Sequence, residues 1–436
     1  MNDTPLAKVF VAFNNILDSK MGTSLGLRKW VEKATYQGTF QSVNLSKQAS
    51  RVFPKPGKKS PAERPEDSKK SDFFDLRLSE EQEMIQQTIQ QFATQYMRKN
   101  AEQLNIDCKI SDNIVQEFQA LGLPYYSVPE SLGGVLTEKA TVTQMIIAEE
   151  LAYGDLGMAV ALLAPTSALN AITQFGTSGQ QEQYIPAFLD EQKPLSAVIA
   201  INEPSALFDP FQLSTKAVKS GSKYIINGIK ASVPLVNSSE LFLVAAEIEG
   251  HGPAIFIVES SQSGVSVESQ NAMGLRPAAL GNITLNNVEV SDDAKLGGDT
   301  LDYATLISYV RLGWCSLAIG TARAILDQVI PYANERIAFG EPISNRQSVA
   351  FMIANIRIEL DTMQVLTQRA AALAEQGKPF QKEAYLAAVS CQERAMDIGN
   401  DGVQLFGGLG FMRDYPAERW YRDLRAVSWC FNGMHL

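Results

Sequence analysis

Histidine and cysteine are scarce in this chain of 436 residues, which holds two histidines and four cysteines. The two histidines lie far apart, and no two of the cysteines form a C-x-x-C pair. The sequence therefore predicts no metal site, because His/Cys metal clusters need such ligands at short spacing. It also predicts no Ser-His-Asp triad. Scattered cysteines without a disulfide framework favour a reducing compartment.

Long apolar runs and an excess of positive charge are missing as well. No run reaches the roughly 18–20 apolar residues of a membrane span, and the start lacks the basic-then-apolar pattern of a signal peptide. The net charge of −10 and the pI of about 5.0 disfavour nucleic acid as a partner. We therefore expect a cytoplasmic protein with no membrane span and no nucleic-acid partner.

Residues 1–75 are predicted to be an N-terminal extension and linker. Val9, Phe10, Phe13 and Ile16 follow helical spacing, which is compatible with an amphipathic helix or with a weakly ordered extension. Residues 51–72 hold four prolines, many charges and few apolar side chains. Such a segment cannot bury enough surface to offset the entropy of ordering, so it is predicted to be a linker.

A chain that begins near Asp72 is expected to melt at the same temperature as the full chain, because the charged, Pro-rich linker isolates the extension from the rest. Thermal unfolding of the two proteins under one buffer condition checks this. A clearly lower melting temperature for the shorter chain would mean that the N-terminal segment packs on the body.

The remainder alternates between helical and strand periodicity. Residues 76–194 are predicted to be helical, starting with the capping box Ser79-x-x-Gln82. Residues 195–300 hold short β-branched and aromatic runs, punctuated by turn residues such as Asn227-Gly228, which predict a small antiparallel barrel or sandwich. Residues 301–436 return to helical spacing. The fold class is therefore α+β, with three units in the order helical, β and helical.

Seven strings in this order resemble motifs of the acyl-CoA dehydrogenases. They are LSEEQ at 78–82, PESLGG at 129–134, EELAYG at 149–154, NEP at 202–204, INGIK at 226–230, ERIAFG at 335–340 with Gln347, and VQLFGGLGFMRDYPAERWYRD at 403–423. The resemblance covers the chain from about residue 76 to its end. It implies an FAD-dependent oxidoreductase that removes two hydrogens from an acyl-CoA thioester and passes the electrons to an electron-transferring flavoprotein.

The resemblance also implies an assembly and a set of site residues. It implies a homodimer or homotetramer, in which Arg336 holds the FAD pyrophosphate of a neighbouring subunit, since a guanidinium forks onto phosphate. It places an arginine of the family's active site at Arg311. The cofactor-binding residues that it implies are Ala200, Asn202, Ser232, Pro234, Arg336, Phe339, Gln347, Gln404, Gly407 and Gly408.

The chain departs from the family pattern where the chemistry lies. The family's Gly-Ser pair is replaced by Leu207-Phe208, and its W-I-T by Ser232-Val233-Pro234, so that proline replaces a threonine that bonds to the flavin. Proline has neither a hydroxyl nor a backbone N–H group.

The catalytic glutamate of the family has no counterpart in this chain. Its position matches Phe431 or, after a shift of one residue, Asn432, and the alternative family position matches Val310. None of the three side chains is a base. Three functions therefore stay open: an acyl-CoA dehydrogenase, a catalytically impaired relative that binds acyl-CoA or a partner subunit, or a flavin monooxygenase or nitroalkane-oxidising relative.

Overall fold

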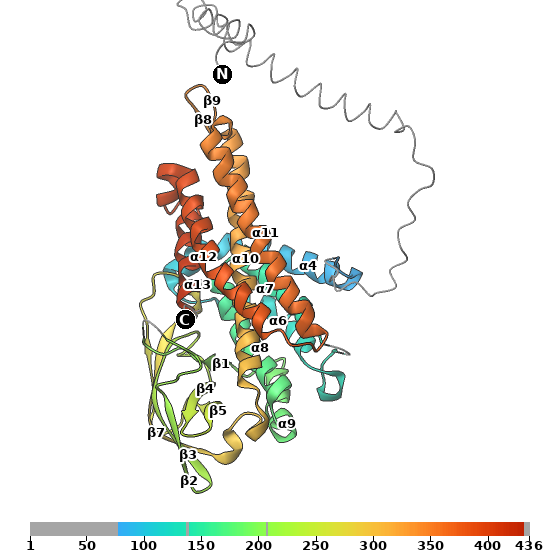
Figure 1. The fold of residues 1–436 in the computed structure, drawn as a ribbon, viewed down its shortest axis with the longest axis vertical. Helices are drawn as coiled ribbons and strands as arrows, with labels where there is room; N and C mark the ends of the chain where they lie inside the picture. Colours follow the sequence, from blue (N-terminus) through green and yellow to red (C-terminus); the bar gives the residue numbers. More distant parts are fainter. Residues whose placement is uncertain (1–76, 137–138, 206–207, 431–436) are drawn as a thin grey trace, which may run out of the picture. The chain divides into compact units, whose positions relative to one another are not determined.

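The computed structural model describes residues 77–136, 139–205 and 208–430, which belong to one compact unit. Figure 1 shows their arrangement. The expected extension and linker at residues 1–75, and the site positions Phe431 and Asn432, lie outside the described residues.

The first part is helical, as predicted. The predicted capping box is present, with the Ser79 side chain accepting from the Gln82 N–H group and the Gln82 side chain accepting from the Ser79 N–H group. The helices here are α4 (Glu80–Phe92), the π-helical turn η1 (Ala93–Met97), α5 (Arg98–Asp107), α6 (Asp112–Gln119), α7 (Thr141–Gly154), α8 (Leu156–Phe175) and α9 (Ser178–Phe188).

Helix α8 is the most apolar of these helices, and it lies in the core of the protein. It is long and apolar enough to cross a membrane by length and composition alone, but two thirds of its most apolar window is buried by the rest of the protein. It packs against α7, α9, α10 and the first strand of the sheet. The Asp155 side chain caps its first turn by accepting from the Met158 N–H group at 2.9 Å.

The middle part is one seven-stranded sheet. Its strands are β1 (Ala197–Ala200), β2 (Lys216–Ser220), β3 (Lys223–Val233), β4 (Leu241–Ile248), β5 (Gly252–Glu259), β6 (Val265–Ser269) and β7 (Gly281–Ser291). The order along the sheet is β1-β4-β2-β3-β7-β6, with β5 paired to β4. Residues of β2, β3, β4, β5 and β7 share one apolar cluster, so the sheet curls around its own core.

Two expectations about the sheet need correction. The pairing is not antiparallel throughout, because β4 runs parallel to both β1 and β2. Asn227-Gly228 is not a turn but lies inside β3, where a bulge in the pairing with β7 follows Ile226. A Cβ at Gly228 would lie 2.5 Å from Thr215 Oγ1. Gly228 therefore lets the backbone of β3 lie close to Thr215, and the Asn-Gly pair marks this close approach and not a turn.

The last part is an assembly of long helices with a short hairpin at its far end (Figure 1). Its elements are α10 (Tyr303–Glu335), β8 (Ile337–Ala338), β9 (Glu341–Pro342), α11 (Gln347–Glu375), α12 (Gln381–Phe406), the 3-10 helix η8 (Gly407–Phe411) and α13 (Ala417–Cys430). α10 packs against α7, α11 and α12 and so joins the two helical parts into one core. The α+β architecture of three units is confirmed.

Candidate active site

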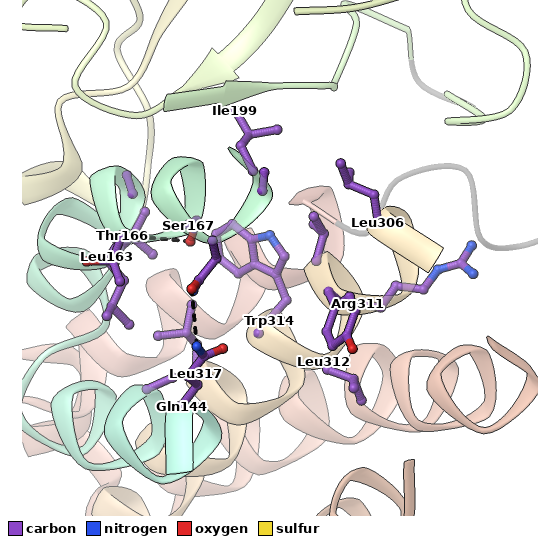
Figure 2. Close-up of a pocket in the computed structure, with 18 of the residues that line it drawn as sticks. Gln144, Leu163, Thr166, Ser167, Ile199, Leu306, Arg311, Leu312, Trp314 and Leu317 are labelled. Atoms are coloured by element: carbon purple, nitrogen blue, oxygen red, sulfur yellow. Dashed lines mark hydrogen bonds between the residues drawn. The ribbon is translucent and has the colours of Figure 1, made fainter. Parts of the chain in front are cut away.

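A cavity of about 280 Å³ lies where the ends of β1 and β3 meet helices α7, α8 and α10. Its sheet-side wall is made by residues 199, 201 and 202 and by residues 232–234. Its helix-side wall includes Gln144 on α7, Ser167 on α8 and Trp314 on α10 (Figure 2). The volume lies just below the roughly 300–1,000 Å³ range of small-molecule sites, and the lining is mostly apolar, as in such sites.

A buried ion pair fixes the sheet-side wall. Lys230 Nζ donates to Glu203 Oε1 at 2.9 Å and to the Ile201 carbonyl at 3.0 Å. Glu203 also accepts from the backbone N–H groups of Ser214 and Thr215. Both side chains are buried, with 0% of Lys230 and 4% of Glu203 exposed. The pair therefore ties the loop after β1 to the middle of β3.

Burial and pairing act in opposite directions on these two groups. Burial lowers the pKa of Lys230 to about 8, although the Glu203 carboxylate acts against this. Burial alone would raise the pKa of Glu203, but the charge of Lys230 and the Thr215 N–H donor outweigh it, so the pKa is lowered. Both groups are therefore charged near neutral pH. Each keeps its charge in the buried site because the opposite charge lies beside it.

Three of the predicted cofactor-binding residues line the cavity next to this ion pair. The Ala231 N–H group donates to the Asn202 carbonyl at 2.9 Å, which holds Asn202 beside the end of β3. An irregularity in the β3–β7 pairing lies between Lys230 and Val233, where Ser232 has a positive φ of 54°. Such irregularities re-aim side chains next to active sites. Asn202, Ser232 and Pro234 all line the cavity as a result.

Ala200, another predicted cofactor-binding residue, does not line the cavity. Its side chain is fully buried in the core of the curled sheet, while its neighbours Ile199 and Ile201 face the helices and the cavity. This follows from the alternation of side chains along a strand. Ala200 can approach a ligand only through its backbone.

Arg311 lies on the cavity rim. Its guanidinium carbon is 5.9 Å from the ring centre of Phe211 and 5.2 Å from that of Tyr385 on α12. Burial lowers its pKa, and Tyr385 opposes this effect. In Figure 2 its side chain points away from Trp314, toward the edge of the cavity. With two aromatic rings within 6 Å, Arg311 places a positive charge at the rim.

The lining chemistry is neutral apart from this arginine. Among the described residues that line the cavity there is no Asp, Glu, His, Cys or Lys. Val310, which matches the alternative family position of the catalytic glutamate, is one of the lining residues. The described wall thus has a place for a catalytic carboxylate but does not hold one.

The other predicted cofactor-binding residues gather at the far end of the helices. Phe339 and Gln404 line a groove of about 660 Å³ between the hairpin, α11 and α12. Arg336 caps the end of α10, and Gln347 begins α11. Phe339 is 95% exposed and has a positive φ of 55°, which is unusual for a bulky residue.

Gly407 and Gly408 follow directly after α12. A Cβ at either residue would meet no atom within 4 Å, and Gly407 has φ 60° and ψ −135°, a backbone conformation that favours glycine. This corner is therefore open to the close approach of a ligand or a second chain.

These two groups of residues are far apart in one chain. Arg311 and Arg336 are 25 residues apart along α10 and its cap, which corresponds to roughly 37 Å at 1.5 Å per residue. One small cofactor cannot touch both in the same subunit.

The sequence motifs missed several cavity residues. Trp314 on α10 and the amide side chains of Gln144 and Asn170 come from three different helices and belong to no motif. Gly313 is a sequence signal for this part of the cavity. A glycine inside a helical pattern lowers the stability of the helix, so its presence indicates a packing or functional reason. A Cβ at Gly313 would meet nothing within 4 Å.

Two buried carboxylates lie at α13: Asp423 belongs to this helix, and Asp155, the N-cap of α8, pairs with Arg419 of the helix. Asp155 accepts from Arg419 Nε at 3.1 Å, and Asp423 accepts from the Leu275 N–H group at 2.7 Å. Asp423 Oδ2 has no hydrogen-bond partner among the described residues. Burial and then repulsion from Asp155 raise the pKa of Asp423 to about 7, against the opposing N–H group of Leu275 and the charges of Arg422 and Arg419.

This raised pKa predicts a pH dependence of stability. Between the ordinary pKa of 3.8 and the folded pKa of about 7, the folded protein holds a proton on Asp423 that the unfolded chain lacks. The free energy of unfolding should therefore fall as pH rises through this window, by at most about 1.4 kcal/mol per pH unit from this group. Urea unfolding from pH 5 to 8 should show a shallower fall for Asp423→Asn, which keeps an acceptor for Leu275. Parallel curves for the variant and the wild type would contradict the assignment.

Three family models match consecutive parts of this chain. The acyl-CoA dehydrogenase N-terminal domain matches residues 79–192, the middle domain matches residues 198–288, and the C-terminal domain matches residues 303–431. The chain belongs to the acyl-CoA dehydrogenase family. Members of this family are oxidoreductases that act on CH–CH groups, and the chain shares their fold from end to end of the described residues.

Individual members support the assignment. The chain is 30% identical over 361 residues to the 3-(aryl)acrylate reductase of Clostridium sporogenes, covering 80% of this chain and 94% of the relative. It is 29% identical over 357 residues to the short/branched chain specific acyl-CoA dehydrogenase of Rattus norvegicus, covering 80% and 82%. The butyryl-CoA dehydrogenase structure from Megasphaera elsdenii superposes with a TM-score of 0.73 at 26% identity, covering 81% and 95%.

The sheet-side wall of the cavity would offer the ring of a bound FAD few side-chain hydrogen bonds. The Glu203–Lys230 pair fixes the wall formed by residues 199, 201, 202 and 232–234. Gly407 and Gly408 leave space for a close approach at the other group of predicted residues, at the far end of the helices. Pro234 cannot donate a hydrogen bond, and the Ser232 hydroxyl donates to Gln270 Oε1 at 3.0 Å. The backbone rather than these two side chains would have to hold the ring.

Proposed function

We propose that this protein binds FAD and an acyl-CoA thioester in the cavity between β1, β3 and α10, and that it dehydrogenates ordinary straight-chain acyl-CoA slowly or not at all. The observation that carries the proposal is the cavity lining, in which no described residue is a carboxylate. Bound FAD would supply the hydride acceptor. Removal of the α-proton needs a positioned base, whose loss typically costs about 10²–10⁴-fold in rate.

The residues around the cavity have different roles in binding. The Glu203–Lys230 pair holds the flavin-side wall rigid, and the apolar lining excludes water around the thioester. Arg311 at the rim supplies a positive charge to a group that enters from there. The wall therefore binds and orients a thioester, while the described residues provide no group that accepts its α-proton.

The alternative is a relative that has no dehydrogenase activity and serves as an acyl-CoA-binding or partner-binding subunit. The same neutral cavity supports it. The colour of the purified protein separates the two: flavin absorbance supports the first function, and a colourless preparation supports the second.

Assembly as a homodimer or homotetramer is part of the proposal. Phe351, Ile358 and Val365 are spaced by seven residues along α11 and are 59%, 61% and 46% exposed. Apolar side chains repeated every seven residues on an exposed helix favour packing against another helix. Arg336 lies roughly 37 Å along α10 from Arg311 at the cavity rim. Because this is too far for Arg336 to reach a cofactor in the cavity of its own subunit, we infer that it acts on the cofactor of a second copy.

Arg336→Ala is therefore expected to lower flavin occupancy without unfolding the protein, since Arg336 is exposed and a charge-assisted contact contributes about 1.5–3 kcal/mol. Flavin absorbance per protein, measured after dialysis, checks this. Arg394→Ala is the matched control, because Arg394 is a partly exposed arginine on α12 that lines neither cavity. Unchanged flavin content in Arg336→Ala, or a monomer with full flavin, would remove this role.

Two further proposals concern the electron acceptor and the location of the protein. We propose an electron-transferring flavoprotein as the electron acceptor. We also propose a cytoplasmic location, which is supported by the free thiols of Cys108, Cys315 and Cys391.

A further inference from the structure

Two amide side chains face each other across the helix-side part of the cavity. Gln144 Nε2 on α7 donates to Asn170 Oδ1 on α8 at 3.1 Å, and both residues line the cavity. Within the part of the chain that the structure describes, Gln144 Oε1 and Asn170 Nδ2 have no partner. The pair therefore offers one acceptor and one donor. Exchanging nitrogen and oxygen on both amides gives the same inventory.

A ligand that fills this part of the cavity must satisfy these two groups. Water satisfies them in an open cavity, but a saturated alkyl chain that displaces the water would leave both unpaired. Sites built to hydrogen-bond a substrate hydroxyl or N–H discriminate strongly against analogues that lack it, because their own polar groups are then buried without partners.

The charge of the wall narrows the choice of ligand. No Asp, Glu, His or Lys is among the described lining residues, and Arg311 points away from Trp314 at the far edge of the cavity (Figure 2). A carboxylate or ammonium group next to Gln144 and Asn170 would therefore be desolvated without a counter-charge. A neutral hydroxyl both donates and accepts, so it matches the pair.

The shape of the cavity also allows a ligand to extend from the sheet-side wall to Gln144 and Asn170. Figure 2 shows Trp314 between Ile199, at the end of β1, and Gln144. Gly313 precedes Trp314, and a Cβ there would meet nothing within 4 Å. A glycine inside a helix lowers helix stability relative to alanine, and no described neighbour uses the space it leaves. An extended chain can therefore pass beside the Trp314 ring toward the amides.

We propose that Gln144 and Asn170 make this cavity specific for a thioester whose acyl group ends in a neutral hydrogen-bonding group, such as a hydroxyl. The thioester end lies at the sheet-side wall, the chain runs along Trp314, and the terminal hydroxyl donates to Gln144 Oε1 and accepts from Asn170 Nδ2. The inference rests on the proposed function, because it assumes that an acyl-CoA enters the cavity.

Isothermal titration calorimetry of the purified protein tests this without any turnover. The ligands are straight-chain acyl-CoAs of four to ten carbons, the same series with a terminal hydroxyl, and CoA alone. At the chain length that fits, the hydroxylated thioester is expected to bind about tenfold more tightly than its alkyl counterpart. The double variant Gln144→Met/Asn170→Leu is expected to lose or reverse this preference. Gln116→Met, an exposed glutamine on α6 outside the cavity, is the control and should keep it.

The outcomes separate the inference from the function on which it rests. Equal binding of the two series to wild type, or a hydroxyl preference that survives in a folded double variant, would overturn the inference and leave the proposed function standing. If no thioester binds more tightly than CoA alone, the proposed function fails too. The wild-type comparison needs no variant, so it decides the matter even if Gln144→Met/Asn170→Leu does not fold.

Discussion

Val310→Glu is expected to raise the rate of flavin reduction by acyl-CoA by about 10²–10⁴-fold, the usual range for a positioned general base. Val310 lines the cavity from α10, so a carboxylate there enters a wall in which the described residues provide no base. The apolar surroundings should also raise the pKa of the new carboxylate toward the working pH, which improves a base. Anaerobic stopped-flow measurement of flavin bleaching checks the rate.

Val310→Gln is the matched control, because it adds the same volume without a base and should show no gain. Phe431→Glu and, failing that, Asn432→Glu are expected to act in the same direction, since these positions match the family glutamate. If all three glutamate variants bind flavin and acyl-CoA but react no faster than wild type, the missing base is not what limits the rate.

Lys230→Met is expected to lower the free energy of unfolding by about 3–5 kcal/mol, because it leaves the Glu203 carboxylate buried and without its charge partner. The sheet-side wall of the cavity should loosen with it, so flavin content should fall as well. Urea unfolding at pH 7 gives the free energy, and flavin absorbance gives the occupancy.

The double variant Glu203→Gln/Lys230→Met is the control for this pair. It removes both charges and should recover part of the lost stability. The recovery is partial because the Gln oxygen can accept from only one of the Ser214 and Thr215 N–H groups, which donate to different oxygens of Glu203. A double variant that is no more stable than Lys230→Met would show that the loss comes from packing around the lysine stem and not from an unpaired charge.

Local patterns were enough to predict the order of the elements. Helical spacing and the Ser79 capping box predicted the helical parts, and runs of β-branched residues predicted the strands. Pairing within the sheet was not predictable in the same way, because strand neighbours are set by contacts distant in sequence. The parallel pair β1–β4 and the mid-strand place of Gly228 depend on such contacts.

Only part of the candidate site was predictable from the sequence. Asn202 lies in a motif string, and Ser232, Pro234 and Arg311 are placed by the resemblance to the family. The structure brings all four to one cavity. Gln144, Asn170 and Trp314 have no common motif and meet only because α7, α8 and α10 pack together. The roles of Phe431 and Asn432 stay predictions drawn from the alignment of the RWYRD string at 419–423 with its family counterpart.

Anaerobic bleaching of the wild-type flavin by a panel of acyl-CoAs of different chain lengths tests the central claim most directly. A protein that binds FAD and thioester but lacks the base should be bleached slowly or not at all by every straight-chain member of the panel. Fast bleaching that persists in Cys430→Ala, which removes the titratable side chain next to position 431, would contradict the account and require a base from elsewhere.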